Sequence, residues 1–201
     1  SFQEYDEPRR ERLLMAALTA NLGMLDLQTK LYQQEAPLSA EQREAIQQHP
    51  QKSADLLKAA GIHDEALLNI VVQHHECYDG SGYLGKKGDD IPEEAQIIAI
   101  ADRYTAMTSP RQHRVPMSAN DGRKSLFDTK GSTHNEPLSM TLIKLLGIFP
   151  PGSFVRLVNG EIALVTKRPV SGMWPTAKSV ITPRGTLFSE PLKRDCNNEL
   201  H

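Results

Sequence analysis

Residues 74–84 read His74-His75-Glu76-Cys77-Tyr78-Asp79-Gly80-Ser81-Gly82-Tyr83-Leu84, two adjacent histidines followed by a glycine-rich segment. The glycines predict a loop that continues to residue 88. The apolar run over 66–72 predicts a buried helix that leads into the histidines. After the loop, Pro92 followed by two glutamates is typical of the first turn of a helix, which the apolar spacing extends to Met107. This stretch is therefore predicted to join two helices and to present its histidines at the end of the first.

Helical spacing also dominates the residues upstream. Apolar residues recur at steps of three and four over about 8–22, which predicts a first helix. Ser39, with Gln42 three residues later, shows the pattern of a capping box at a helix start. Because proline removes a helical hydrogen bond, we expect a break near His49-Pro50 and a second helix that ends at Gly61.

The character of the sequence changes after Pro150. β-prone runs flank Asn159-Gly160, and a second pair flanks residues 183–185, which predicts an antiparallel meander of about four strands over roughly 152–190. The fold class is therefore expected to be mainly α, a bundle of about five to seven helices with a small C-terminal antiparallel β-meander. The predicted domains are residues 1–149, which form the helical domain, and residues 150–201, which form the β-hairpin module and tail.

Composition excludes several classes of protein. The 201 residues include 23 Lys and Arg and 25 Asp and Glu, a formal net charge of −2, which provides no polybasic field for nucleic acid or acidic membranes. Only Cys77 and Cys196 occur, which favours a reduced protein without disulfides. No apolar run approaches the roughly 18 residues needed to span a bilayer, and residues 1–6 lack a signal-peptide pattern. We therefore expect a cytoplasmic chain with no membrane segment and no nucleic-acid partner.

Six side chains of the kinds that bind transition metals lie in or near the glycine-loop region, Glu76 and Asp79 among them. His74 and His75 are adjacent, His49 precedes Pro50, and Asp102 lies on the next predicted helix. Neutral imidazoles and carboxylates are ligands that borderline divalent ions favour. Taken singly, a histidine before proline is usually a solvated helix end, and Asp102 is usually a cap or an ion-pair partner. The residues alone leave both interpretations open.

The order of these motifs resembles that of the HD-GYP family, a branch of the HD metal-dependent phosphohydrolases. The resemblance rests on residues 74–84, Ile91-Pro92, residues 95–104, Met107-Thr108-Ser109 and Arg111. Weaker similarity over 38–57 and over 142–157 extends it to nearly the whole chain. It implies an HD-type helical bundle and, for the family, hydrolysis of the bacterial second messenger cyclic di-GMP at a metal centre.

Several positions depart from the family pattern. The family has Ala-Ala-Leu-Leu-His-Asp-Ile-Gly-Lys where residues 16–24 read AALTANLGM, so Ala20 and Asn21 replace the signature histidine and aspartate. Met24 replaces a lysine, and Thr105 replaces a second carboxylate. Because the family aspartate bridges two metal ions, the resemblance implies that Asn21 abolishes the dinuclear centre. The remaining family positions can hold at most one divalent transition ion, Fe, Mn or Zn, through His49, His74, His75 and Asp102.

The resemblance also indicates contacts to ligands and partners. Arg111 and Arg114 match a basic segment whose guanidinium groups can bind phosphate oxygens, and a solvated charged loop is the alternative. Tyr83 is expected to stack on a guanine base of cyclic di-GMP or to contact a partner protein. In the family this loop, here Gly82, Tyr83 and Leu84, is linked to cyclic di-GMP synthesising domains of the GGDEF type. Leu84 stands where the family motif ends in proline.

The sequence therefore predicts a degenerate HD-GYP domain in bacterial cyclic di-GMP signalling. With no catalytic residue assigned, we expect it to act by binding a partner or nucleotide rather than by turnover. One alternative is a weak metal-dependent cyclic di-GMP phosphodiesterase, and another is a purely structural output module whose former active site is now core. The metal content of the purified chain distinguishes the metal-dependent phosphodiesterase from the structural module.

Overall fold

The structure is a computed structural model of the chain. It describes residues 5–109, 115–127, 133–169 and 174–196. Two compact units make up the chain, one of residues 1–116 and 129–139 and the other of residues 117–128 and 140–201. The predicted mainly α fold with a C-terminal antiparallel sheet is confirmed. The domain boundary expected between residues 149 and 150 stays a prediction. Within the described ranges, no helix is both long and apolar enough to cross a membrane.

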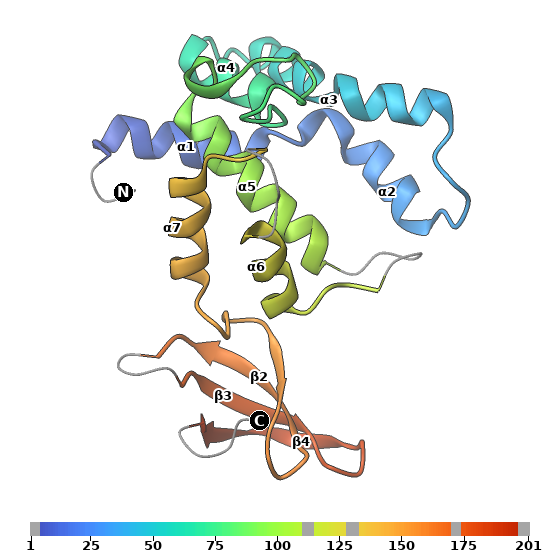
Figure 1. Cartoon of the computed structure of the whole chain (residues 1–201). Helices are drawn as coiled ribbons and strands as arrows, with labels where there is room; N and C mark the ends of the chain where they lie inside the picture. The colour runs from blue at the N-terminus through green and yellow to red at the C-terminus, as the bar shows by residue number, and fades with distance from the viewer. Residues whose placement is uncertain (1–4, 110–114, 128–132, 170–173, 197–201) are drawn as a thin grey trace. The chain divides into compact units, whose positions relative to one another are not determined.

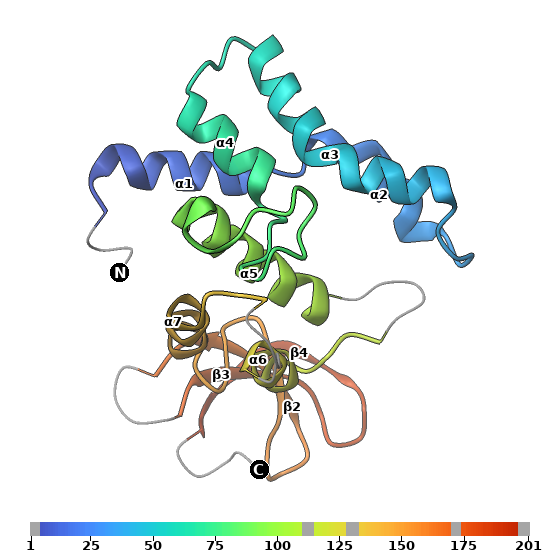
Figure 2. The ribbon, with the colours of Figure 1, turned by 45° about the horizontal axis from the view of Figure 1, so that its top comes forward.

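The first unit consists of helices that pack around α4. Its elements are α1 (Glu7–Thr19), the 3-10 helix η2 (Leu22–Met24), α2 (Leu25–Gln33), α3 (Ala40–Ala59), α4 (Glu65–Gln73), the 3-10 helix η3 (Gly88–Asp90) and α5 (Glu93–Thr108). α4 contacts α1, α3 and α5, and η2 contacts α3 (Figures 1 and 2). The residues that follow α4 are therefore held by helices on several sides.

Side chains supplied by the sequence cap three of these helices. The carboxylate of Asp6 accepts a hydrogen bond from an amide in the first turn of α1, and that of Asp64 accepts two from α4. Ser39 and Gln42 form the predicted capping box at the start of α3. Because the first amides of a helix have no intrahelical acceptor, such caps fix where it begins. The capping box predicted at Ser39 is confirmed.

The predicted break near His49-Pro50 is wrong. α3 runs without interruption from Ala40 to Ala59, with Pro50 inside it. Proline deprives the carbonyl four residues earlier of its usual helical donor, and that carbonyl belongs to Ile46. His49 Nδ1 lies 2.6 Å from the Ile46 oxygen and supplies a donor in its place. A side chain thus compensates for the missing amide and the helix continues.

The first helix is shorter than the spacing predicts, and α2 follows where no helix is predicted. A Cβ atom on Gly23 would lie 2.6 Å from the carbonyl oxygen of His49, so the chain passes very close to α3. The Gly23 amide donates to Ser53 Oγ at 2.8 Å, and the Ser53 hydroxyl donates to the Ala20 carbonyl at 2.7 Å. This tertiary contact ends α1 at Thr19, and helical periodicity carries no signal of it.

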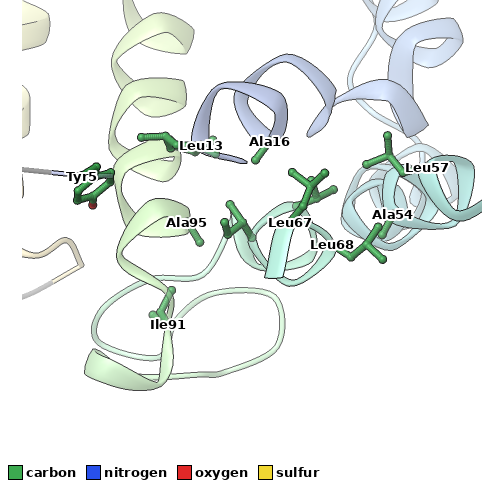
Figure 3. Close-up of a cluster of buried hydrophobic side chains, with 12 residues drawn as sticks. Tyr5, Leu13, Ala16, Ala54, Leu57, Leu67, Leu68, Ile91 and Ala95 are labelled. Carbon is green, nitrogen blue, oxygen red and sulfur yellow. The ribbon is translucent and has the colours of Figure 1, made fainter. Parts of the chain in front are cut away.

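Apolar side chains from α1, α3, α4 and α5, together with Tyr5 before α1 and Ile91 before α5, form the core of the first unit. Its labelled members in Figure 3 are Tyr5, Leu13, Ala16, Ala54, Leu57, Leu67, Leu68, Ile91 and Ala95. Burial of a leucine or isoleucine side chain stabilises a fold by roughly 1.5–3 kcal/mol. Since Leu67 and Leu68 lie on α4, this core holds in place the helix that leads into the two adjacent histidines.

The second unit contains a four-stranded antiparallel sheet in the order β1-β2-β3-β4. The strands are β1 (Phe154–Arg156), β2 (Ile162–Lys167), β3 (Thr176–Ile181) and β4 (Leu187–Asp195), and the unit includes α6 (Ala119–Phe127) and most of α7 (Glu136–Leu146). The turn at Asn159-Gly160 joins β1 to β2, with Gly160 at φ +83°. The buried carboxylate of Glu161 accepts hydrogen bonds from Ser179 and from the Arg194 guanidinium.

Candidate metal centre

Three histidines from two segments meet inside the first unit. His49 lies in the middle of α3, His74 is the C-terminal cap of α4, and His75 follows it. One ligand atom of each lies within 4.8 Å of those of the other two. His49 is 1% exposed and His74 is 0% exposed, and His75 is partly buried. The structure therefore brings together three of the four predicted ligands.

Main-chain carbonyls fix the tautomers of two of these rings. His49 Nδ1 lies 2.6 Å from the Ile46 oxygen, and His74 Nδ1 lies 2.7 Å from the Val71 oxygen. Because a carbonyl can only accept, each Nδ1 carries the proton, and in a neutral ring each Nε2 is bare.

The two bare nitrogens face each other. His49 Nε2 and His74 Nε2 are 3.2 Å apart. Two imidazole nitrogens on one tetrahedral zinc ion lie about 3.3 Å apart, given bonds of roughly 2.0–2.1 Å. Since two nitrogens without protons cannot hydrogen-bond to each other, this arrangement fits a shared divalent transition ion.

Burial keeps the imidazoles in the form that binds metal. Burial lowers the pKa of His74 to about 4 and the pKa of His75 to about 3. Repulsion between protonated neighbouring rings adds to both shifts. Burial also lowers the pKa of His49. The neutral imidazole is the metal ligand, so at neutral pH an ion would enter without displacing protons from these rings.

Asp102 lies on α5 beside this cluster. Burial lowers the pKa of His49, and the negative charge of Asp102 acts against this shift. Burial raises the pKa of Tyr83, and the charge of Asp102 raises it further. The group whose ligand atoms lie within 4.8 Å of one another consists of the three histidines and does not include Asp102. Coordination by Asp102 as a fourth ligand stays a prediction.

Glu76 anchors the glycine loop that follows the histidines. Its carboxylate is buried, and it accepts hydrogen bonds from the amides of Leu84 at 2.7 Å and Lys86 at 2.8 Å. Gly82 passes so close that a Cβ atom there would lie 2.5 Å from the Cα of Glu76. The anchored loop places the Tyr83 ring 5.0 Å from the His75 ring, measured between centroids. Sequence reasoning counted Glu76 with the two histidines as a possible metal ligand and did not predict that it anchors the loop.

A second contact missed by sequence reasoning involves Thr133 and His134, which are distant in the sequence from the glycine loop. The Tyr78 amide donates to the Thr133 carbonyl at 2.8 Å, and Arg103 donates to His134 Nε2 at 3.0 Å. Burial and the Arg103 charge lower the pKa of His134, and the Asp79 carboxylate opposes them. Residues far apart in the sequence meet here, so no local spacing predicts the contact.

The positions that depart from the family pattern lie near η2 and on α5. Ala20 is fully buried, and its carbonyl is held by Ser53. Asn21 and Met24 are partly buried, and Thr105 is exposed. None of these four side chains carries the imidazole, carboxylate or ammonium group that the resemblance would place there.

The predicted ligand-binding residues are only partly within the described structure. Arg111 and Arg114 lie outside the described residues. Tyr83 is 42% exposed and Leu84 is 55% exposed, so the tip of the loop is accessible beside the histidine cluster.

Comparison with known proteins identifies the family. A family model described as an HD domain matches residues 2–137, which include α1 to α5 and all three clustered histidines. The chain therefore belongs to the HD domain family.

Individual relatives extend this assignment. The chain is 25% identical over 187 residues to the cyclic di-GMP phosphodiesterase PA4108 of Pseudomonas aeruginosa, a match that covers 92% of this chain and 43% of that protein. It is 31% identical over 121 residues to the cyclic di-GMP phosphodiesterase response regulator RpfG of Xanthomonas campestris. This match covers 58% of this chain and 32% of that protein. The solved structure of Bd1817, a HDG"Y"P protein from Bdellovibrio bacteriovorus, matches with a TM-score of 0.58 and 22% identity over 71% of this chain and 45% of that one. The chain spans less than half the length of each of these proteins. The predicted HD-GYP type is confirmed.

Proposed function

We propose that this chain is a degenerate HD-GYP domain of bacterial cyclic di-GMP signalling, which binds nucleotide or a partner protein and is impaired in hydrolysis. The relatives named as cyclic di-GMP phosphodiesterases support the signalling context. One observation carries the proposal of impairment. Three neutral imidazoles meet in the site, and the neutral amide of Asn21 stands where the family pattern has a metal-bridging aspartate.

Hydrolysis by the family design requires two metal ions. Two bound ions would supply an activated water and the positive charge that a phosphodiester needs during hydrolysis. Two dications about 4 Å apart repel each other by on the order of 15 kcal/mol at an effective dielectric constant of about 20. A bridging carboxylate offsets much of this repulsion, and Asn21 offers no charge to do so. A single ion is therefore the expected occupant.

That ion would bind through His49 and His74 by their bare Nε2 atoms and through His75, with Asp102 as the proposed fourth ligand. The donor set suits Fe, Mn or Zn. When bound, the ion would supply a Lewis acid toward a phosphate oxygen. The protein supplies three neutral rings for it, two of them fully buried.

The accessible loop tip supports the binding role. Tyr83 and Leu84 are exposed on a loop whose backbone is anchored to Glu76, so their side chains are presented in a defined position. We propose that Gly82, Tyr83 and Leu84 contact a GGDEF-type domain, or that Tyr83 stacks on a guanine base. Arg111 and Arg114 are the proposed phosphate contacts.

A weak metal-dependent phosphodiesterase is the second candidate. The charge of Asp102 acts on His49 in the site, so one carboxylate is present near the proposed ion. Such an enzyme would contain bound metal and show slow multiple turnover of cyclic di-GMP.

Elemental analysis of the purified chain, combined with binding measurements, tests the proposal. We expect at most one Fe, Mn or Zn per chain, lost in His75→Ala and retained in His63→Ala, which alters an exposed histidine. Calorimetry with cyclic di-GMP and a pull-down with GGDEF domains should show binding that falls in Tyr83→Ala. Tyr32→Ala, at a tyrosine exposed on α2, is the matched control. About two ions per chain retained through dialysis would contradict the single-ion site, and binding that is equal in both tyrosine variants would contradict the loop assignment.

A further inference from the structure

Pro50 is a buried proline inside α3, directly after His49. A proline has no N–H to donate to the carbonyl four residues earlier, and its ring crowds that carbonyl. The carbonyl concerned is that of Ile46. It is therefore open to a donor other than the backbone of residue 50.

His49 supplies this donor through Nδ1, at 2.6 Å from the Ile46 oxygen. The same arrangement recurs at His74, whose Nδ1 lies 2.7 Å from the Val71 oxygen, again three residues earlier. α4 ends at Gln73, and the last carbonyls of a helix have no intrahelical donor. Both histidines thus use a carbonyl that an interrupted hydrogen-bond ladder leaves available.

We propose that Pro50 is a positioning residue for the histidine cluster. By withholding a backbone N–H from the Ile46 carbonyl, it gives His49 Nδ1–H an acceptor and keeps His49 Nε2 bare. Were the carbonyl taken by a backbone amide, His49 would gain more by carrying its proton on Nε2. From there it would donate to the bare Nε2 of His74, 3.2 Å away, and that bond would occupy both nitrogens that an ion needs. Only the statement about an ion rests on the proposed function.

Two substitutions separate this role from simple packing. Pro50→Ala and Pro50→Gly both restore an N–H at residue 50, while alanine and glycine differ strongly in helix propensity. An effect shared by both variants therefore comes from the restored amide. Ala54→Gly is the matched control, because Ala54 is buried one turn later on α3 and the change removes a methyl group without adding an amide.

The first measurement is a long-range ¹H–¹⁵N spectrum of the histidine rings in metal-free protein, which distinguishes protonated from bare ring nitrogens. We expect the Nε2–H tautomer of His49 to predominate in both Pro50 variants, and the Nδ1–H tautomer to persist in the unmodified chain and in Ala54→Gly. Pro50→Ala is expected to fold, because it adds a helix-forming residue and a backbone donor. If Pro50→Gly unfolds, the His49 tautomer in Pro50→Ala alone decides the test. An unchanged His49 tautomer in folded Pro50→Ala would overturn the proposal, since the Ile46 carbonyl would then accept both donors.

Titration with Zn²⁺ is the second measurement. We expect the Pro50 variants to bind Zn²⁺ roughly 10- to 100-fold more weakly, the usual effect of losing the hydrogen-bond partner of a metal ligand. A tautomer switch with unchanged Zn²⁺ affinity would refute the link between Pro50 and the ion. A tautomer switch in a chain that binds no Zn²⁺ in any form would instead leave the positioning role intact and refute the proposed metal site.

Discussion

At the scale of single residues, Glu76 holds the glycine loop that follows the two adjacent histidines. Its buried carboxylate binds two loop amides, those of Leu84 and Lys86, and Gly82 packs directly against it. Hydrogen bonds to a charged group contribute about 1.5–3 kcal/mol each. The sequence predicted the loop from its glycines, but bonds from one carboxylate to backbone amides follow no periodic pattern and were not predicted.

Glu76→Gln should loosen the loop while the helices stay folded. The amide side chain offers one acceptor where the carboxylate offers two, so we expect the free energy of unfolding to fall by about 1–3 kcal/mol. Amide hydrogen exchange at Leu84 and Lys86 should become at least about tenfold faster. Glu41→Gln, at an exposed glutamate in the first turn of α3, is the control and should leave both amides unchanged. Equal protection of the loop amides in the two variants would show that Glu76 is not the anchor.

Restoring the two signature residues tests the proposed reason for the proposed impairment of hydrolysis. We expect the double variant Ala20→His, Asn21→Asp to bind more metal per chain than the unmodified protein, because it regains an imidazole and a bridging carboxylate. Hydrolysis of cyclic di-GMP should stay poor, since Met24 and Thr105 still lack charges and groups that act as a unit do not recover activity separately. Elemental analysis and product quantification measure the two effects. Full hydrolysis by the double variant would show that these two positions alone account for the impairment.

At the scale of elements, sequence reasoning succeeded where the signal was local. The capping box of α3 and the turn at Asn159-Gly160 depend on neighbouring residues, and both are found where predicted. The break at Pro50 was wrong because a side chain replaced the missing backbone donor. The early end of α1 was missed because it depends on a contact between Gly23 and Ser53, which are distant in the sequence.

The sheet contains a charge pair with a predictable pH dependence. Hydrogen bonding to Arg194 lowers the pKa of Glu161 below its ordinary value of 4.5. The stabilisation is therefore fully present above about pH 4.5 and is lost as the pH falls through the lower pKa of the folded state. At pH 7 we expect Glu161→Gln to lower the free energy of unfolding of the sheet unit by about 1.5–3 kcal/mol.

Urea unfolding at several pH values measures this dependence. The difference in the free energy of unfolding between the unmodified chain and Glu161→Gln should shrink as the pH is lowered from 7 to about 3. Glu190→Gln, at an exposed glutamate on β4, should differ little from the unmodified chain at any pH. A Glu161→Gln difference that does not change with pH would mean that the pair does not titrate in this range.

At the scale of the whole molecule, the order of motifs predicted the HD-type fold, and the match to an HD domain model confirms the family. That order also predicted His49, His74 and His75 as members of one ligand set, and the structure places their ligand atoms within 4.8 Å of one another. Sequence reasoning placed Asp102 in the same ligand set. Its charge acts on His49, and its coordination of an ion stays a prediction. The distance from Asp102 to the three histidines depends on how α5 packs, which local spacing in the sequence does not determine.

We propose that this HD-GYP domain is impaired in the hydrolysis of cyclic di-GMP, and a multiple-turnover hydrolysis assay tests this proposal most directly. The purified chain would be reconstituted anaerobically with Fe²⁺ or Mn²⁺ and incubated with excess cyclic di-GMP, and linear and mononucleotide products would be quantified over time. Because Asn21 cannot bridge two ions, we predict no product beyond that formed by the metal ions alone. Rapid product formation over many turnovers, abolished in His75→Ala, would contradict the claim and identify the chain as a working phosphodiesterase.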